Sequence, residues 1–254
     1  LYSILQDDFR AFCSALIPYP ARPLLPLMVV SLLLVNALAV TSLTNERDSK
    51  ALDLLLVTDL TPREIIYGKL GGVFFNSKEM ILLPLALTAY VWGTGHMSTE
   101  NLVFVILGYF VMLGFAAVLG IHCGMTYANS RQAVAVSLGT LLFLFVGISI
   151  GMRTMMVLEN QFNQQLMTFS GFIAGGGFAL YGVLGWRLRS LALKIGLGAL
   201  PAWTFFVITS FLQHQYGSVF LVTVIAYGLA TAAMLVPAVD EFDVATGRTG
   251  ERRD

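Results

Sequence analysis

The chain has 254 residues, of which 57% are hydrophobic and 12% are charged. Soluble domains carry about 25% charged residues, and a core of this length could not bury so many apolar side chains, so the composition indicates a protein surrounded by lipid. The formal net charge is zero, which argues against a nucleic-acid partner recognised through bulk charge.

Residues 1–22 precede the first long apolar run. Leu5, Phe9, Phe12 and Leu16 recur at helical spacing, which predicts a short amphipathic segment on the extracytoplasmic membrane surface. The segment lacks the basic start and short apolar run of a signal peptide. Because the sequence starts at Leu1, we expect a fragment or a processed chain that lacks an upstream span.

Residues 23–239 are predicted to form an all-α, polytopic bundle of transmembrane helices. About 20 apolar residues cross a bilayer as a helix, and lipid offers no hydrogen-bond partner to an open strand edge. The intervals between charged residues therefore predict about seven spans, near 24–43, 72–93, 102–122, 133–151, 168–186, 196–212 and 219–238. A polar tail, 240–254, follows.

The second span is irregular because Lys78 and Glu79 fall inside it. The helix could begin about two turns before the hydrocarbon, Lys78 could extend toward the headgroups, or the two charges could face a protein interior. We favour the first of these interpretations.

The distribution of Lys and Arg predicts the orientation. If residues 44–70 are cytoplasmic, only Arg10, Arg22 and Arg153 lie outside, and the other loop cations lie inside. This arrangement places the C-terminal tail in the cytoplasm.

Residues 44–70 form a dense charged loop between two apolar segments. Thr44 or Asn45 could cap a first short helix, whose apolar face would hold Leu52, Leu55 and Leu56. Thr61, Pro62 and Glu64 have the spacing of a capping box with proline at the first helical position. Two short amphipathic helices with a capped corner would make a rigid protrusion able to transmit a push.

The run from Glu46 to Lys69 resembles the signature loop of permease subunits of type-2 ATP-binding-cassette transporters. In that family the loop contains the coupling helix that docks on the ATPase. The resemblance implies an ATPase-coupling role for a set of matching residues: Glu46, Arg47, Leu52, Leu55, Leu56, Thr58, Thr61, Pro62, Glu64, Gly68 and Lys69. The chain departs from the family at Ser49-Lys50 and at Asp59, which leaves the subfamily open. Residues 128–137 resemble the short cytoplasmic turn before the family's fifth span.

Other motifs are weak. Gly68-Lys69 lacks the earlier glycine and the following Ser or Thr of a phosphate-binding loop, so we expect no ATP binding, no enzymatic activity and no cofactor in this chain.

His122 and Cys123 are adjacent and would point about 100° apart on a helix, which does not suit a shared metal site. The methionines near residues 152–167 could suit copper(I), but methionine is common in apolar interfaces, and we predict no metal.

Pairs of glycines four residues apart predict close helix contacts. The pairs are Gly68/Gly72, Gly120/Gly124, Gly147/Gly151 and Gly171/Gly175.

These features favour the membrane subunit of an ATP-driven transporter in the bacterial cytoplasmic membrane. Among such transporters we favour an exporter. The expected partners are a cassette ATPase, a second permease subunit and membrane lipid. An ion-coupled carrier using Lys78 and Glu79, and a scaffold without transport activity, are the alternatives.

Overall fold

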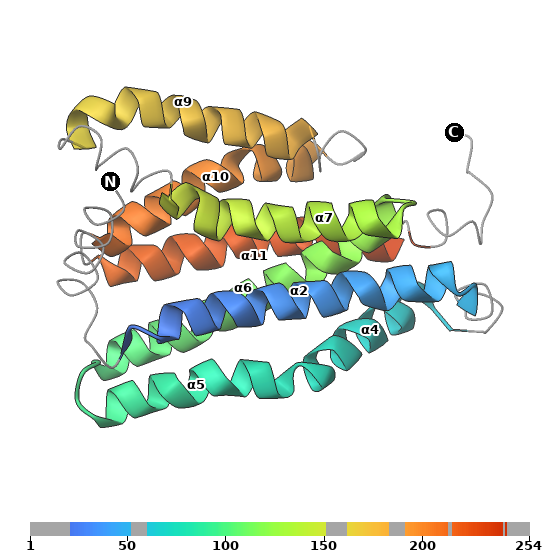
Figure 1. Cartoon of the computed structure of the whole chain (residues 1–254), viewed down its shortest axis with the longest axis horizontal. Helices are drawn as coiled ribbons and strands as arrows, with labels where there is room; N and C mark the ends of the chain where they lie inside the picture. The colour runs from blue at the N-terminus through green and yellow to red at the C-terminus, as the bar shows by residue number, and fades with distance from the viewer. Residues whose placement is uncertain are drawn as a thin grey trace.

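The computed structural model describes residues 21–51, 60–150, 162–182, 191–212, 215–240 and 242, and within these ranges every element is a helix. The elements are α2 (Leu24–Asp48), α4 (Pro62–Asn76), α5 (Lys78–Gly93), α6 (Thr99–Thr126), α7 (Ser130–Leu141), the π-helix η2 (Leu142–Gly147), α9 (Phe162–Leu180), α10 (Leu191–Leu212) and α11 (Tyr216–Asp240). Most of the helices run roughly along the long axis of the molecule and pack side by side (Figure 1). The prediction of an all-α bundle is confirmed for these ranges. The predicted amphipathic segment and most of the polar tail lie outside them.

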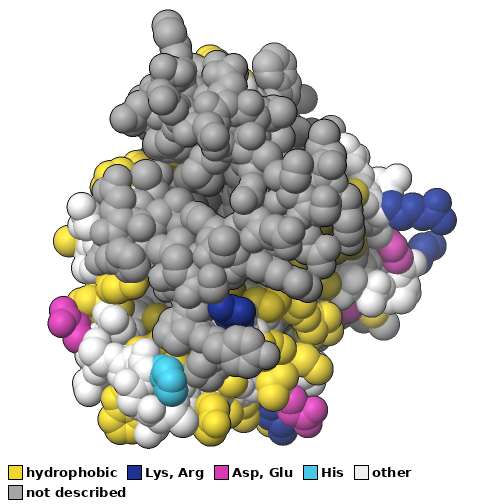
Figure 2. Space-filling model, turned by 60° about the vertical axis from the view of Figure 1, so that its left-hand side comes forward, with side chains coloured by type: hydrophobic (Ala, Val, Ile, Leu, Met, Phe, Trp, Pro, Cys, Tyr) yellow, Lys and Arg dark blue, Asp and Glu magenta, His cyan; other side chains and the backbone are white. Residues whose placement is uncertain are grey.

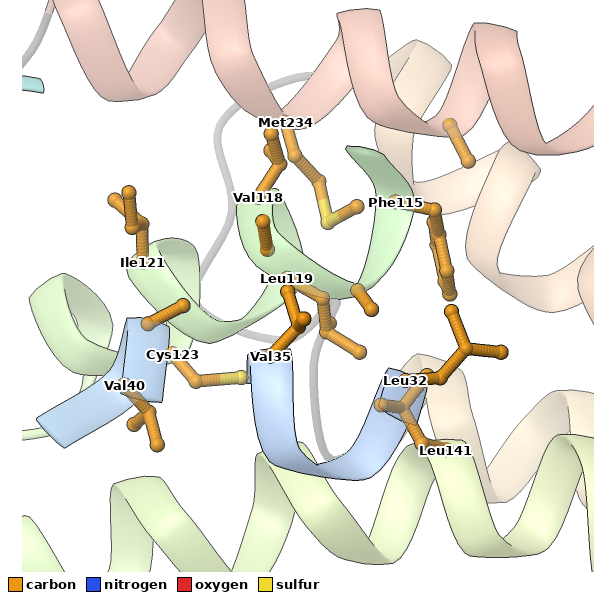
Figure 3. Packing of buried hydrophobic residues seen from close by; sticks show 14 of the residues in the cluster. Leu32, Val35, Val40, Phe115, Val118, Leu119, Ile121, Cys123, Leu141 and Met234 are labelled. Carbon is orange, nitrogen blue, oxygen red and sulfur yellow. The ribbon is translucent and has the colours of Figure 1, made fainter. Parts of the chain in front are cut away.

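Helix α6 is the centre of the bundle. It packs against α2 and α11, and α7 contacts both α2 and α6. Figure 3 shows Phe115 and Leu119 of α6 between Val35 of α2 and Met234 of α11, and all four side chains are almost fully buried. This contact packs α2 and α11 against α6.

Two glycines of α6 allow α2 to approach closely. A Cβ atom at Gly120 would lie 2.7 Å from Ala39 Cβ and 2.8 Å from the Asn36 carbonyl oxygen. One at Gly124 would lie 3.2 Å from Leu43 Cβ. The predicted close contact is therefore confirmed for this pair.

The other predicted glycine pairs behave differently. A Cβ atom at Gly68, Gly72, Gly171 or Gly175 would meet nothing within 4 Å, so these positions do not mark helix contacts within the described part of the chain. Gly151 lies outside it.

Buried polar side chains join the same three helices. Asn36 of α2 donates from Nδ2 to the Ala116 carbonyl of α6 at 2.8 Å, and its Oδ1 accepts from Ser137 Oγ of α7 at 2.9 Å. Closer to the start of α2, the hydroxyls of Ser31 and Tyr109 form a further hydrogen bond between α2 and α6. Satisfied polar groups in an apolar bundle fix the register of the helices that carry them.

The prediction of seven spans is not supported. Within the described ranges, four helical segments are long and apolar enough to cross a membrane: Leu24–Asp48, Thr99–Thr126, Ser130–Ile150 and Tyr216–Val239. The segments predicted near 168–186 and 196–212 coincide with parts of α9, 19 residues long, and α10, 22 residues long. Within the described side chains, only the shorter apolar stretches Ser170–Leu180 and Gly198–Val207 are identified there.

The span predicted near 72–93 is not one straight helix. Helices α4 and α5 meet at an angle of 58°, and they make a fifth candidate span only if the bent pair is counted as one. The chain departs from regular helix at Ser77, whose Oγ donates to the Val73 carbonyl at 2.7 Å. The bend lies at the polar run Asn76, Ser77, Lys78 and Glu79, which marks an irregularity in the sequence but does not specify a change of helix direction.

The outer surface is rich in apolar side chains. Among the large exposed ones are Phe75, Leu82, Phe178 and Leu229. Figure 2 shows yellow hydrophobic side chains over much of the described surface, with Lys, Arg, Asp and Glu in a few small groups. Such a surface and several long apolar helices are compatible with an integral membrane protein.

Candidate coupling site

Three segments distant in the sequence meet at one end of the bundle. They are the last turn of α2, helix α4 and the turn between α6 and α7, which lie toward the right in Figure 1. Side-chain hydrogen bonds and one ion pair connect them. This end holds the described residues of the predicted coupling loop.

The predicted capping box at the start of α4 is confirmed. Thr61 has extended backbone geometry, its Oγ1 accepts from the Glu64 amide at 3.3 Å, and the Glu64 carboxylate accepts from the Thr61 amide at 2.8 Å. Pro62 occupies the first turn. The backbone hydrogen bond from Thr61, followed by the side-chain bond, lowers the pKa of the exposed Glu64 carboxyl, so the cap is complete above that lowered pKa and is lost as the pH falls through it.

Helix α4 is tied to α2 by an ion pair. Lys69 Nζ lies 2.5 Å from a Glu46 carboxylate oxygen and also donates to the Ser42 carbonyl at 3.2 Å. The Lys69 side chain is only 10% exposed and that of Glu46 is 37% exposed. Their partial burial strengthens the attraction relative to a pair in bulk water.

Arg47 connects α2 to the turn between α6 and α7. Its Nη1 donates to the carbonyls of Gly124 at 3.0 Å and Tyr127 at 2.8 Å, and its Nη2 donates to Ser130 Oγ at 3.3 Å. Ser130 Oγ in turn donates to the Asp48 carboxylate at 2.6 Å. A shallow surface hollow beside this network is lined by Asp48, Ala128, Asn129, Ser130 and Arg131.

Sequence reasoning missed four members of this network: Asp48, Ser130 and the carbonyls of Gly124 and Tyr127. A signal was available, because residues 128–137 resemble a cytoplasmic turn and would lie at the same membrane face as Arg47. The pairing itself depends on how α2 and α6 cross, which no local pattern specifies.

The predicted first cap of the loop is wrong. Thr44 and Asn45 lie inside α2, which continues to Asp48, and Thr44 is buried. The chain turns only at Ser49 and Lys50, where Lys50 adopts a left-handed backbone with φ of 57°. Glu46 and Arg47 thus belong to the last turn of α2, a helix long and apolar enough to cross a membrane, and not to a separate short helix.

The remaining predicted residues are divided between the described and undescribed parts of the chain. Gly68 is exposed on α4 with open space beside it. The apolar face of the first loop helix and Thr58 lie outside the described residues: Leu52, Leu55, Leu56 and Thr58.

Lys78 and Glu79 are both exposed at the start of α5. Lys78 Nζ lies 4.3 Å from the centroid of the Phe75 ring, a cation–π distance. Neither side chain faces the interior of the described bundle, so the third interpretation given for this pair does not hold within it.

His122 and Cys123 are buried in α6. His122 Nε2 lies 3.5 Å from Thr126 Oγ1. Within the described ranges no group of three or more His, Cys, Asp or Glu side chains could hold a metal ion. Met152, Met155 and Met156 lie outside those ranges.

Comparison with models of protein families, with curated proteins and with solved structures found no match to this chain.

Proposed function

We propose that the chain is the membrane-spanning permease subunit of an ATP-binding-cassette transporter, and that residues 44–70 contact a separate ATPase subunit. The observation that carries the proposal is the ion pair between Glu46 and Lys69 beside the capped start of α4. It joins both helices that flank the loop, so a force applied to the loop would reach α2 and α4 together.

The capping box serves the same purpose. A helix whose first turn is fixed by Thr61, Pro62 and Glu64 resists fraying, and a stiff end transmits displacement better than a loose one. In this proposal two such subunits in the bacterial cytoplasmic membrane form the pathway of an exporter, with the loop cytoplasmic. ATP hydrolysis occurs in the partner and switches the helices between two arrangements.

The two alternatives have less support. A carrier driven by an ion gradient would use ionisable side chains facing a protein interior or a water-filled cavity, whereas Lys78 and Glu79 are exposed. No described feature favours a scaffold.

Site-specific photo-crosslinking would test the contact. A photoreactive residue at Arg63, which is exposed in the first turn of α4, should capture a cassette ATPase, identified by mass spectrometry. The same residue at His96, exposed in the turn that follows α5, should not. Equal capture at both positions, or none at Arg63, would contradict the proposal.

A capping variant would test transmission. Pro62→Gly combined with Glu64→Ala should abolish ATP-dependent transport in reconstituted vesicles and leave membrane insertion intact, because the first turn of α4 loses its cap. The matched control is Ser98→Ala, which removes the cap of α6, where Ser98 Oγ accepts from the Asn101 amide at 3.2 Å. Transport by the double variant at the level of the control would count against a coupling role.

A further inference from the structure

The side chain of Arg47 is directed into the bundle, toward α6 and α7. It lies in the last turn of α2, is partly buried, and spends its donors on the Gly124 and Tyr127 carbonyls and on Ser130. The resemblance noted in the sequence groups Arg47 with residues that couple to an ATPase. The Nε atom of Arg47 is buried and has no hydrogen-bond partner in the described part of the chain, so this nitrogen is not accessible to another protein.

The position of Arg47 follows from the contact between α2 and α6. Ala39, Leu43 and Arg47 are each four residues apart and so share one face of α2. Ala39 lies against Gly120, Leu43 against Gly124, and Arg47 reaches the Tyr127 carbonyl. The two glycines bring the backbones of α2 and α6 so close that the guanidinium of Arg47 reaches the carbonyl groups at the end of α6.

The acceptors are groups that need a partner. The last four carbonyls of an α-helix have no donor within the helix, and they carry the negative end of the helix dipole. Helix α6 ends at Thr126, so the Gly124 carbonyl is one of these, and Tyr127 is the residue that follows the helix. A cation at this place both satisfies the carbonyls and is attracted by the dipole.

Ser130 extends the connection into α7. It is the first residue of that helix, it accepts from Arg47, and it donates to Asp48, the last residue of α2. The end of α2 therefore holds both sides of the turn between α6 and α7.

We propose that Arg47 is a positioning residue that fastens the turn between α6 and α7 to the end of α2, so that these three helices move as one body. This inference rests on the proposed function for its consequence: displacement of the coupling loop then moves α6 and α7 directly, and Arg47 acts within the permease and not on the ATPase.

The fastening itself is tested without any ATPase, by hydrogen exchange of the purified chain. Arg47→Ala should speed exchange of the amides of Tyr127 and Ala133 by about tenfold, the loss expected for charge-assisted hydrogen bonds. These amides bond to the Cys123 and Asn129 carbonyls. Arg47→Lys, which keeps one cationic donor, should show a smaller change. Lys50→Ala, which removes an exposed cation two residues after α2, should show none. Unchanged exchange in Arg47→Ala would overturn the inference.

The consequence is tested with the ATPase present. Arg47→Ala should bind the ATPase with its affinity changed less than about twofold, while ATP-driven transport falls at least about tenfold and Arg47→Lys recovers part of it. A large loss of binding in Arg47→Ala would make Arg47 a direct contact and overturn the inference. If the unaltered chain binds no cassette ATPase, the proposed function fails, and the exchange experiment still decides whether the fastening exists.

Discussion

At the scale of single residues, the end of the bundle is organised by charges that are partly removed from water. Lys69 and Glu46 are far apart in the sequence, yet they meet where α4 passes α2. A lysine that is 10% exposed would be costly without an acceptor, so the Glu46 carboxylate and the Ser42 carbonyl together make its position favourable.

This pair can be measured with a double-mutant cycle. Glu46→Gln and Lys69→Met should each destabilise the protein, and together they should cost less than the sum, with a coupling energy on the order of 1 kcal/mol, because removing one partner leaves the other without its counter-charge. Denaturant unfolding in detergent micelles would measure the three variants.

The matched control combines Lys69→Met with Glu79→Gln, a change of the same kind at an exposed acid on α5. That pair should be additive. Additive effects in the Glu46 and Lys69 pair as well would mean that the ion pair adds no stability, and the tie between α2 and α4 would then rest on packing alone.

At the scale of the elements, the contact between α2 and α6 depends on the absence of side chains. Gly120 leaves room for Ala39 and for the Asn36 backbone, and Asn36 then reaches both the Ala116 carbonyl and Ser137. Close backbone approach and internal hydrogen bonds are the main means of association for helices in lipid, where burial of apolar groups gives little driving force.

Two alanine substitutions in α6 distinguish the steric requirement of the contact between α2 and α6 from the effect of helix propensity. Gly120→Ala should destabilise the protein by about 1–3 kcal/mol, because its Cβ would overlap Ala39 and the Asn36 carbonyl. Gly108→Ala should be neutral or slightly stabilising, because a Cβ there meets nothing within 4 Å and alanine is the better helix former. Thermal unfolding in micelles would compare them, and equal stabilities would refute the close contact.

How much of this could be predicted depends on whether the signal is local. The capping box of Thr61, Pro62 and Glu64 was readable because all its partners lie within four residues. The contact at Gly120 and Gly124 was readable as a possibility, although the same spacing at Gly68 and Gly72 faces open space. The partners of Arg47 were not readable, since they depend on where the end of α6 lies relative to α2.

The predictions of where α2 ends and of a straight span near 72–93 were wrong for a related reason. Thr44 and Asn45 are good capping residues. The packing of Leu43 against Gly124 and the hydrogen bonds of Arg47 nevertheless stabilise the helical conformation as far as Asp48. At Ser77 the polar run from Asn76 to Glu79 signals an interruption of the apolar segment, but a polar run does not specify the angle at which the two helices meet.

At the scale of the whole molecule, the two ends of the bundle differ in charge. The end formed by the last turn of α2, the start of α4 and the turn after α6 holds Arg47, Lys50, Arg63 and Arg131. At the other end, the turn between α5 and α6 holds no lysine or arginine, and Arg22 precedes α2. Cytoplasmic ends of membrane proteins are enriched in these residues.

Thiol labelling in intact cells would establish the orientation. In a variant with both natural cysteines replaced, His96→Cys should react with a membrane-impermeant maleimide from outside, and Ser49→Cys should react only after the membrane is permeabilised. Both positions are exposed. The reverse pattern would place residues 44–70 outside the cell and would refute the coupling proposal.

The π-helix η2 has a consequence for chain length. A π turn contains one residue more than an α turn over the same rise, so Leu142–Gly147 acts as a single-residue insertion in an otherwise α-helical segment. Deleting one residue there would convert the turn to α-helix and keep Leu141 and Ile148, both fully buried, on the side they now occupy. The same deletion within Ser130–Leu141 would rotate one part of the segment against the other by about 100° and turn one of those side chains toward lipid. Variants of this protein that differ in length should therefore differ first at η2.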